Sequence, residues 1–278
     1  MKTPLSKYPL LSRFILAIVL FGSALFLSGL IDTPFLKHYF PFTSVILLII
    51  ATWLLFKSEK KSLKNIGLTL SFRNVSFLPL GILIGALAFT LAKYFRGLYT
   101  GETFEFTTSN VNYKAILYAA YVILPTVAVE EFLFRGYAFK KAIEASNVIV
   151  ANVIFATIFM LIHILDRNVI QNTGMVVFLA ITIPIGHLLF ATALLKSKTL
   201  FFPIGIHLGN NWATQHLISN HNNGNSIFYI PETVSFETWT PFIIVIIIWN
   251  AFYLLITCLI WKWDAISGII KPKTPSKI

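Results

Sequence analysis

The sequence predicts an all-α integral membrane protein, a polytopic bundle of about eight transmembrane helices. Two features of its composition lead to this fold class: 56% of the 278 residues are hydrophobic and only 12% are charged. Soluble domains carry about 25% charged residues, so this chain is too apolar for an ordinary water-soluble fold. A helical span needs about 20 apolar residues, and the length therefore allows about eight spans in one transmembrane domain, residues 1–278.

Apolar segments that can form these spans follow one another along the whole chain. They cover residues 14–31, 41–56, 77–92, 113–139, 147–165, 173–195, 199–218 and 241–261. We interpret the first as a membrane anchor and not a signal peptide, because its apolar run is long and no small-x-small cleavage site follows it. The second and third are short for a bilayer, and no internal repeat or soluble domain interrupts the series.

The distribution of Lys and Arg predicts the orientation in the membrane. With eight spans, the loops on one side and both termini hold 16 of the 22 Lys and Arg, whereas the opposite loops hold five. The positive-inside rule then places both termini in the cytoplasm. The net charge of +11 is thus a topological signal that faces anionic lipid, and nucleic-acid binding is not expected. The single Cys258 excludes an intramolecular disulfide and a cysteine-based zinc site.

Three ionisable residues lie within six positions of the fourth apolar segment: Glu130, Glu131 and Arg135. An ionisable side chain in the hydrocarbon core costs at least a few kcal/mol unless it is paired or hydrated. Arg135 follows Glu131 by one helical turn, so these two are expected to form an intrahelical ion pair. Glu130 points about 100° away from Glu131 and remains the freer carboxylate, which is suited to proton transfer.

Polar residues of three other segments are predicted to reach the depth of these glutamates. Counting about 1.5 Å per residue from the flanking lysines puts Glu131, His187 and His207 near the middle of the bilayer. His163 lies as far beyond the turn after the fourth segment as Glu131 lies before it. Asn211 follows His207 by one turn and shares its helix face. Each of these residues can also be a hydrogen-bonded contact between helices, and His187 is the residue best explained in this way.

Three motifs formed by these residues resemble a known family. The patterns EExxxR, FxxxH and HxxxN occur in this order, as Glu130-Glu131-Phe-Leu-Phe-Arg135, Phe159-Met-Leu-Ile-His163 and His207-Leu-Gly-Asn-Asn211. Their order resembles that of the CPBP family of intramembrane peptidases, which includes CAAX prenyl endopeptidases, Abi proteins and bacteriocin-processing relatives. The resemblance covers a motif-bearing core at about residues 113–218.

The resemblance implies an intramembrane endopeptidase that hydrolyses a peptide bond of a membrane-associated protein or peptide. Such a reaction needs a base, an activated water and donors aimed at the developing oxyanion. The family pattern assigns water activation to Glu130 and His163, oxyanion stabilisation to His207 and Asn211, and a supporting role to Glu131 and Arg135.

The motifs do not decide whether a metal takes part in catalysis. A zinc ion held by Glu130, His163 and His207 would match known ligand types. However, the sequence contains no HExxH motif, and a glutamate-based mechanism without metal uses the same residues. His187 lies outside the family pattern, and its role stays open.

Two other function classes remain open on the sequence alone. A relative of the same family can act without catalysis, as a membrane immunity protein or a peptide-binding protein. A transporter with a buried Glu/His proton relay is a weaker alternative, because no repeat symmetry is visible. For the enzyme we expect a membrane-embedded or lipidated peptide substrate. We expect the protein to lie in a cell membrane, namely a bacterial inner membrane. Whether the substrate is prenylated is not indicated.

Overall fold

Helices form most of the computed structural model, which describes residues 9–108 and 110–270. The larger helices are α2 (Pro9–Ile31), α4 (Thr43–Ser58), α5 (Phe72–Thr100), α6 (Tyr113–Arg135), α8 (Val148–Ile164), α10 (Thr173–Ser197), α11 (Phe201–Trp212) and α12 (Trp239–Trp261). The smaller elements are α3 (Pro34–Tyr39), α7 (Tyr137–Ala145), α9 (Arg167–Ile170), α13 (Trp263–Ile270), a 3-10 turn η1 (Leu63–Ile66) and a π-helical turn η2 (Ala213–Leu217). Each of the eight apolar segments forms a helix, so the predicted all-α membrane fold class is confirmed.

The expected number of eight full spans is not confirmed. Within the described residues, five helices are long and apolar enough to cross a bilayer: α2, α5, α6 together with α7, α10 and α12. The helices α4 and α8 are apolar but have only 16 and 17 residues, and α11 has 12. The chain is therefore a multi-pass membrane protein whose helices differ widely in length.

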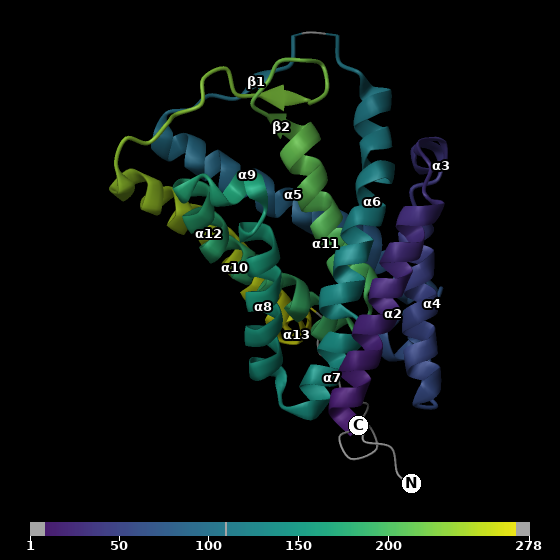
Figure 1. The fold of residues 1–278 in the computed structure, drawn as a ribbon. Helices are drawn as coiled ribbons and strands as arrows, with labels where there is room; N and C mark the ends of the chain where they lie inside the picture. Colours follow the sequence, from purple (N-terminus) through teal and green to yellow (C-terminus); the bar gives the residue numbers. More distant parts are fainter. Residues whose placement is uncertain (1–8, 109, 271–278) are drawn as a thin grey trace, which may run out of the picture.

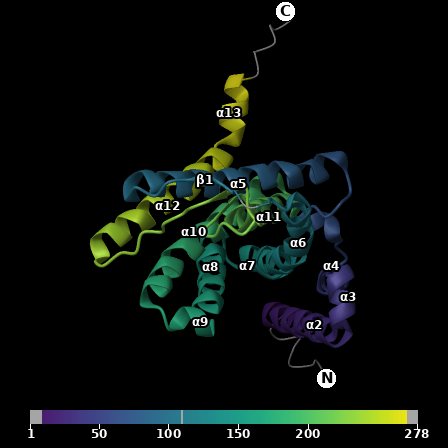
Figure 2. The same cartoon turned by 90° about the horizontal axis from the view of Figure 1, so that it is seen from above.

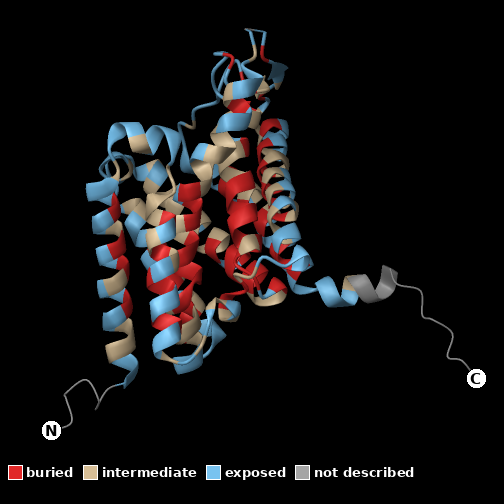
Figure 3. Cartoon of the chain, turned by 90° about the vertical axis from the view of Figure 1, so that its right-hand side faces the viewer, coloured by how far each residue is buried: buried red, intermediate tan, exposed pale blue. Residues whose placement is uncertain are grey.

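The helix α11 lies at the centre of the bundle. It packs against α5, α6 and α10, and every residue from Phe202 to Gly209 is buried. Around this centre, α8 packs on α10 and α7, α12 packs on α10 and α5, and α2 pairs with α4 at the periphery (Figures 1 and 2). Buried residues gather on the inner helix faces and exposed residues on the outer faces (Figure 3). Many of the exposed residues are large and apolar, as expected of a surface that contacts lipid.

Glycines allow α5 and α11 to approach each other closely. Gly81 and Gly85 of α5 face Gly205 and Gly209 of α11, and a Cβ atom at any of these positions would collide with backbone atoms of the other helix. This small-xxx-small pattern on both partners is typical of close helix pairs in membranes. Because His207 lies between the two glycines of α11, this contact fixes the height at which His207 enters the bundle.

A break at Gly136 separates α6 from α7. The backbone there leaves helical values, with φ −81° and ψ −134°, and a Cβ atom would collide with the carbonyl oxygen of Phe132. The sequence predicted one continuous span over residues 113–139, but the regular helix ends at Arg135. A single glycine is often tolerated inside a helix, so the sequence pattern did not indicate this break.

Three turns meet at one end of the molecule, which we call the basic end. The amide of Leu200 donates to the carbonyl of Ile66 over 3.0 Å, and Lys61 pairs with Glu144 over 3.1 Å. These turns belong to the lysine-rich set of loops defined by the sequence. At the opposite end, a small sheet of β1 (Glu105–Phe106), β3 (Phe228–Tyr229) and β2 (Ile218–Ser219) joins the loops that follow α5 and α11 (Figure 1).

Candidate active site

The buried ion pair between Glu131 and Arg135 forms the base of the site. The Arg135 guanidinium donates to Glu131 Oε1 over 3.1 Å, and neither side chain has exposed surface. The guanidinium also lies over the rings of Phe159 and Phe190, at 4.3 and 5.0 Å from their centroids. The intrahelical pair expected from the spacing is thus present, and aromatic rings of two other helices enclose it.

His207 of α11 lies between the two glutamates of α6. Its Nδ1 is 2.8 Å from Glu131 Oε1, and its Nε2 is 3.7 Å from Glu130 Oε2. The imidazole also stacks on Phe190, with ring centroids 4.7 Å apart. Because the Glu131 carboxylate accepts hydrogen bonds when it is ionised, it orients His207 with Nδ1–H as the donor and Nε2 towards Glu130.

Glu130 is the freer of the two carboxylates. Its side chain keeps 25% of its surface exposed, whereas that of Glu131 keeps none. Among the described residues its Oε2 has no hydrogen-bond partner, since the Nε2 of His207 is too far away for a direct bond. The result is an unpartnered carboxylate oxygen opposite an imidazole that a second carboxylate holds in place.

His163 lies at the same level but does not touch these groups. Its Nδ1 is 2.7 Å from the carbonyl oxygen of Phe159, so Nδ1–H is the donor and Nε2 is free to accept. Phe159 contacts Arg135, and α6 and α8 run in opposite directions (Figure 1). Glu131 lies one turn before Arg135, and His163 lies one turn after Phe159. Because the two helices are antiparallel, Glu131 and His163 are at the same depth. Within the described residues His163 has no hydrogen bond or ion pair with either glutamate.

Asn211 is oriented by residues that the motifs do not include. Its Oδ1 accepts from Asn210 Nδ2 over 3.3 Å, and the Oδ1 of Asn210 accepts from the Tyr253 hydroxyl of α12. In the described part of the chain, this leaves the Nδ2 of Asn211 without a protein partner. Asn210 does not share the helix face of His207 on α11, so the motifs gave no reason to expect its contact with Tyr253. The sequence offered two signals for this contact: Asn210 is adjacent to Asn211, and Tyr253 is a polar residue in an apolar segment.

His187 lies in an aromatic enclosure near the ion pair. It is fully buried, its ring is 5.6 Å from that of Phe139 and 6.5 Å from that of Phe159, and neither ring nitrogen has a partner in the described residues. It makes no hydrogen bond with Glu130 or His207 there.

The possible zinc ligands do not form a metal site in this arrangement. Among the described residues, no three His, Cys, Asp or Glu side chains are grouped so that they could hold a metal ion. The hydrogen bonds of His207 to Glu131 and of His163 to a backbone carbonyl are made through Nδ1 and do not themselves oppose a metal, because they leave the Nε2 of each ring open. Among the described residues, Glu130, His163 and His207 are nevertheless not grouped as a three-ligand zinc centre.

Comparison with known families addresses the same segment. Residues 112–213 match the family model of Rce1-like type II CAAX prenyl endopeptidases. No curated protein and no solved structure matches the chain. The matched segment runs from the start of α6 to just beyond the end of α11 and includes all three motifs. The family resemblance predicted from the motifs is thus confirmed for residues 112–213.

Proposed function

We propose that the protein is an intramembrane endopeptidase that hydrolyses a peptide bond of a membrane-associated protein or peptide. One observation carries this proposal: Glu130 Oε2 lies unpartnered 3.7 Å from His207 Nε2, while Glu131 holds the other imidazole nitrogen. The two facing atoms are too far apart to bond to each other, so both keep their hydrogen-bonding capacity for a substrate or a water. The family match supplies the reaction class.

In the proposed mechanism, Glu130 is the general base. Its carboxylate takes a proton from a water as the water oxygen attacks the carbonyl carbon of the scissile bond. The free Nε2 of His163 accepts the second hydrogen bond of that water and fixes its position. Glu130 then passes the proton to the leaving nitrogen, so that one water is consumed and one peptide bond is broken.

His207 and Asn211 are the proposed donors to the oxyanion. The Nδ2 of Asn211 has no hydrogen-bond partner among the described residues, and the Oδ1 of the same amide accepts from Asn210. His207 already donates Nδ1–H to Glu131, so it can donate from Nε2 only as an imidazolium ion. The carboxylates on both sides of the ring attract the positive charge of that ion. Removing one donor of such an oxyanion site typically lowers kcat about 10²–10³-fold.

Substitution of Glu130 tests the proposal. The purified full-length protein, reconstituted in lipid, is incubated with membrane-embedded peptides with and without a prenyl group, and cleavage is followed by mass spectrometry. Glu130→Gln should lower cleavage at least about 100-fold and leave the melting temperature unchanged, because the Oε2 has no partner to lose. The matched control is Glu232→Gln, an exposed carboxylate in the loop before α12, which should cleave at the wild-type rate.

The result also separates this function from its alternative. Undiminished cleavage by Glu130→Gln would contradict the assigned base. Binding of the peptides without cleavage by the wild-type protein would favour a non-catalytic immunity or peptide-binding protein.

We further propose how the protein lies in its membrane. The whole chain, residues 1–278, acts as one transmembrane domain with its catalytic core at 113–218. The lysine-rich loops place the basic end and both termini in the cytoplasm, and the membrane is that of a bacterial cell. The substrate then reaches Glu130 from within the bilayer as a membrane-embedded or lipidated segment.

A further inference from the structure

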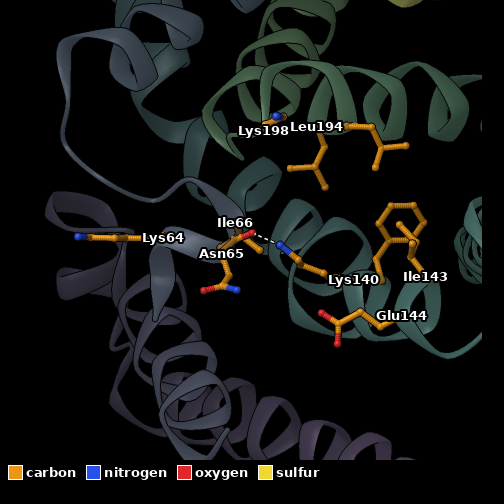
Figure 4. Close-up of a pocket in the computed structure, with 10 residues that line it drawn as sticks. Lys64, Asn65, Ile66, Lys140, Ile143, Glu144, Leu194 and Lys198 are labelled. Carbon is orange, nitrogen blue, oxygen red and sulfur yellow. Dashed lines mark hydrogen bonds between the residues drawn. The ribbon is translucent and has the colours of Figure 1, made fainter. Parts of the chain in front are cut away.

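A cavity of about 390 Å³ lies at the basic end, away from the Glu130 site. Three separate elements form its walls: η1, α7 and the end of α10 with the turn that follows (Figure 4). Its floor is apolar and consists of Ile66, Phe139, Ile143, Leu194 and Leu195. None of these residues belongs to the three motifs, so the cavity has no part in the proposed reaction.

Two lysines bring positive charge to this apolar floor. The Nζ of Lys140 donates to the backbone carbonyl of Asn65 across the cavity (Figure 4), and an ammonium group has two further donors to offer. Lys198 is exposed at the opposite wall. Lys64 also lines the cavity, but its charged end points away from Lys140 (Figure 4). The cavity therefore combines an apolar surface with a cationic rim.

The lining acid does not cancel this charge. Glu144 is the only acidic residue among those that line the cavity. Its carboxylate already pairs with Lys61 over 3.1 Å and with Lys141 over 2.7 Å. Glu144 also attracts Lys140 through space, but Lys140 and Lys198 keep ammonium donors for an anion from outside the protein.

The rim around Lys198 is preformed. The Thr199 hydroxyl donates to the carbonyl of Gly67 over 3.0 Å, and a Cβ atom at Gly67 would collide with the carbonyl oxygen of Lys198. Lys198 itself has a φ of 62°, a left-handed conformation in which glycine or asparagine is usual after a helix. The turn is thus held tightly against η1, and it presents a lysine there.

We propose that this cavity binds an anionic phospholipid, with the phosphate between Lys140 and Lys198 and part of an acyl chain over the apolar floor. A small hydrated anion would gain nothing from that floor, whereas a phospholipid satisfies both parts of the cavity. The basic end also lies where lysine-rich turns flank apolar helices, which is the level of the lipid headgroups. The proposal does not depend on the protein being a peptidase.

Native mass spectrometry of the full-length protein in detergent tests the site. The protein is titrated with a phosphatidylglycerol and with a phosphatidylcholine that has the same acyl chains. The wild-type protein should form a one-to-one complex preferentially with phosphatidylglycerol. Lys198→Ala and Lys140→Ala should each weaken that complex about fivefold and leave phosphatidylcholine binding unchanged. Lys57→Ala removes the same charge at the basic end but outside the cavity, and should have no effect.

Two further measurements distinguish a phospholipid in the cavity from a free anion or a lipid held only by surface charge. Leu195→Trp fills the floor of the cavity and should reduce the phosphatidylglycerol complex while the melting temperature without lipid is retained. Inorganic phosphate in large excess should not displace the lipid. Equal binding of both lipids, an equal loss in Lys57→Ala and Lys198→Ala, or displacement by phosphate alone would each overturn the proposal.

Discussion

Replacing Arg135 by methionine should destabilise the whole protein. Methionine is an apolar side chain of comparable length to arginine. The substitution leaves the fully buried Glu131 without the cation that lies 3.1 Å away. A buried charge that loses its partner costs about 3–5 kcal/mol. The His207 imidazole, 2.8 Å from the same carboxylate oxygen, remains and offsets part of this cost, which favours the lower end of the range.

The aromatic contacts of Arg135 add to the loss. Its guanidinium lies 4.3 Å from the centroid of Phe159, and a desolvated contact of this kind contributes about 1–2 kcal/mol. The expected total is therefore about 4–5 kcal/mol. At about 2–4 °C per kcal/mol for a chain of this size, the melting temperature should fall on the order of 10 °C.

Thermal unfolding in detergent, followed by tryptophan fluorescence, measures this effect. Four proteins are compared: wild type, Arg135→Met, Glu131→Gln and the double variant. The double variant should melt above Arg135→Met, because no unpaired charge remains, and the coupling between the two positions should be about 2–3 kcal/mol. A melting temperature of Arg135→Met within about 2 °C of wild type, or a double variant no more stable than Arg135→Met, would refute the reasoning.

Three further predictions concern the rest of the molecule. Burial opposes ionisation of Glu59, but hydrogen bonds from Lys141 and a neighbouring tyrosine outweigh it and lower the pKa of Glu59 below 4.5. The resulting stability is present above pH 4.5 and is lost as the pH falls through the folded-state pKa, so Glu59→Gln should flatten the acid limb of melting temperature against pH. Gly209→Leu should separate α11 from α5 and reduce both melting temperature and cleavage, whereas the same change at an exposed helix position should not. In a variant without the native cysteine, single cysteines at 57–76 should be protected from an impermeant thiol reagent added outside the cell and those at 220–238 should react; reversed labelling would invert the proposed orientation.

The contacts that could be predicted from the sequence are those that depend on one helix or on a short motif. The pair of Glu131 and Arg135 follows from the 3.6-residue period alone, since positions four apart share a helix face. The contact between Glu130 and His207, in contrast, brings together two segments that are distant in the sequence. It could be expected only because both residues reach one depth and belong to motifs that occur together.

Contacts that depend on the choice of neighbouring helices could not be predicted. Nothing in an apolar run reveals that Tyr253 of α12 faces Asn210 of α11, because periodicity gives a face but not its partner. The break at Gly136 depends on one backbone conformation, which no pattern of side chains specifies. The close contact of α5 and α11 is an intermediate case, since GxxxG occurs in both segments but does not say that they pair with each other.

The unequal helix lengths have a consequence for the surrounding bilayer. At about 1.5 Å per residue, α4 and α8 extend about 24–26 Å, whereas α5 extends about 43 Å and runs obliquely through the bundle. A hydrocarbon core is about 30 Å thick. Lipids beside α4 and α8 must therefore thin locally, at a cost of a fraction of a kcal/mol per Å of mismatch. Shorter-chain lipids should need less deformation beside α4 and α8, whereas a long helix such as α10 must tilt more in them. Acyl-chain length is therefore a variable that acts on the stability of the molecule without any change to the protein itself.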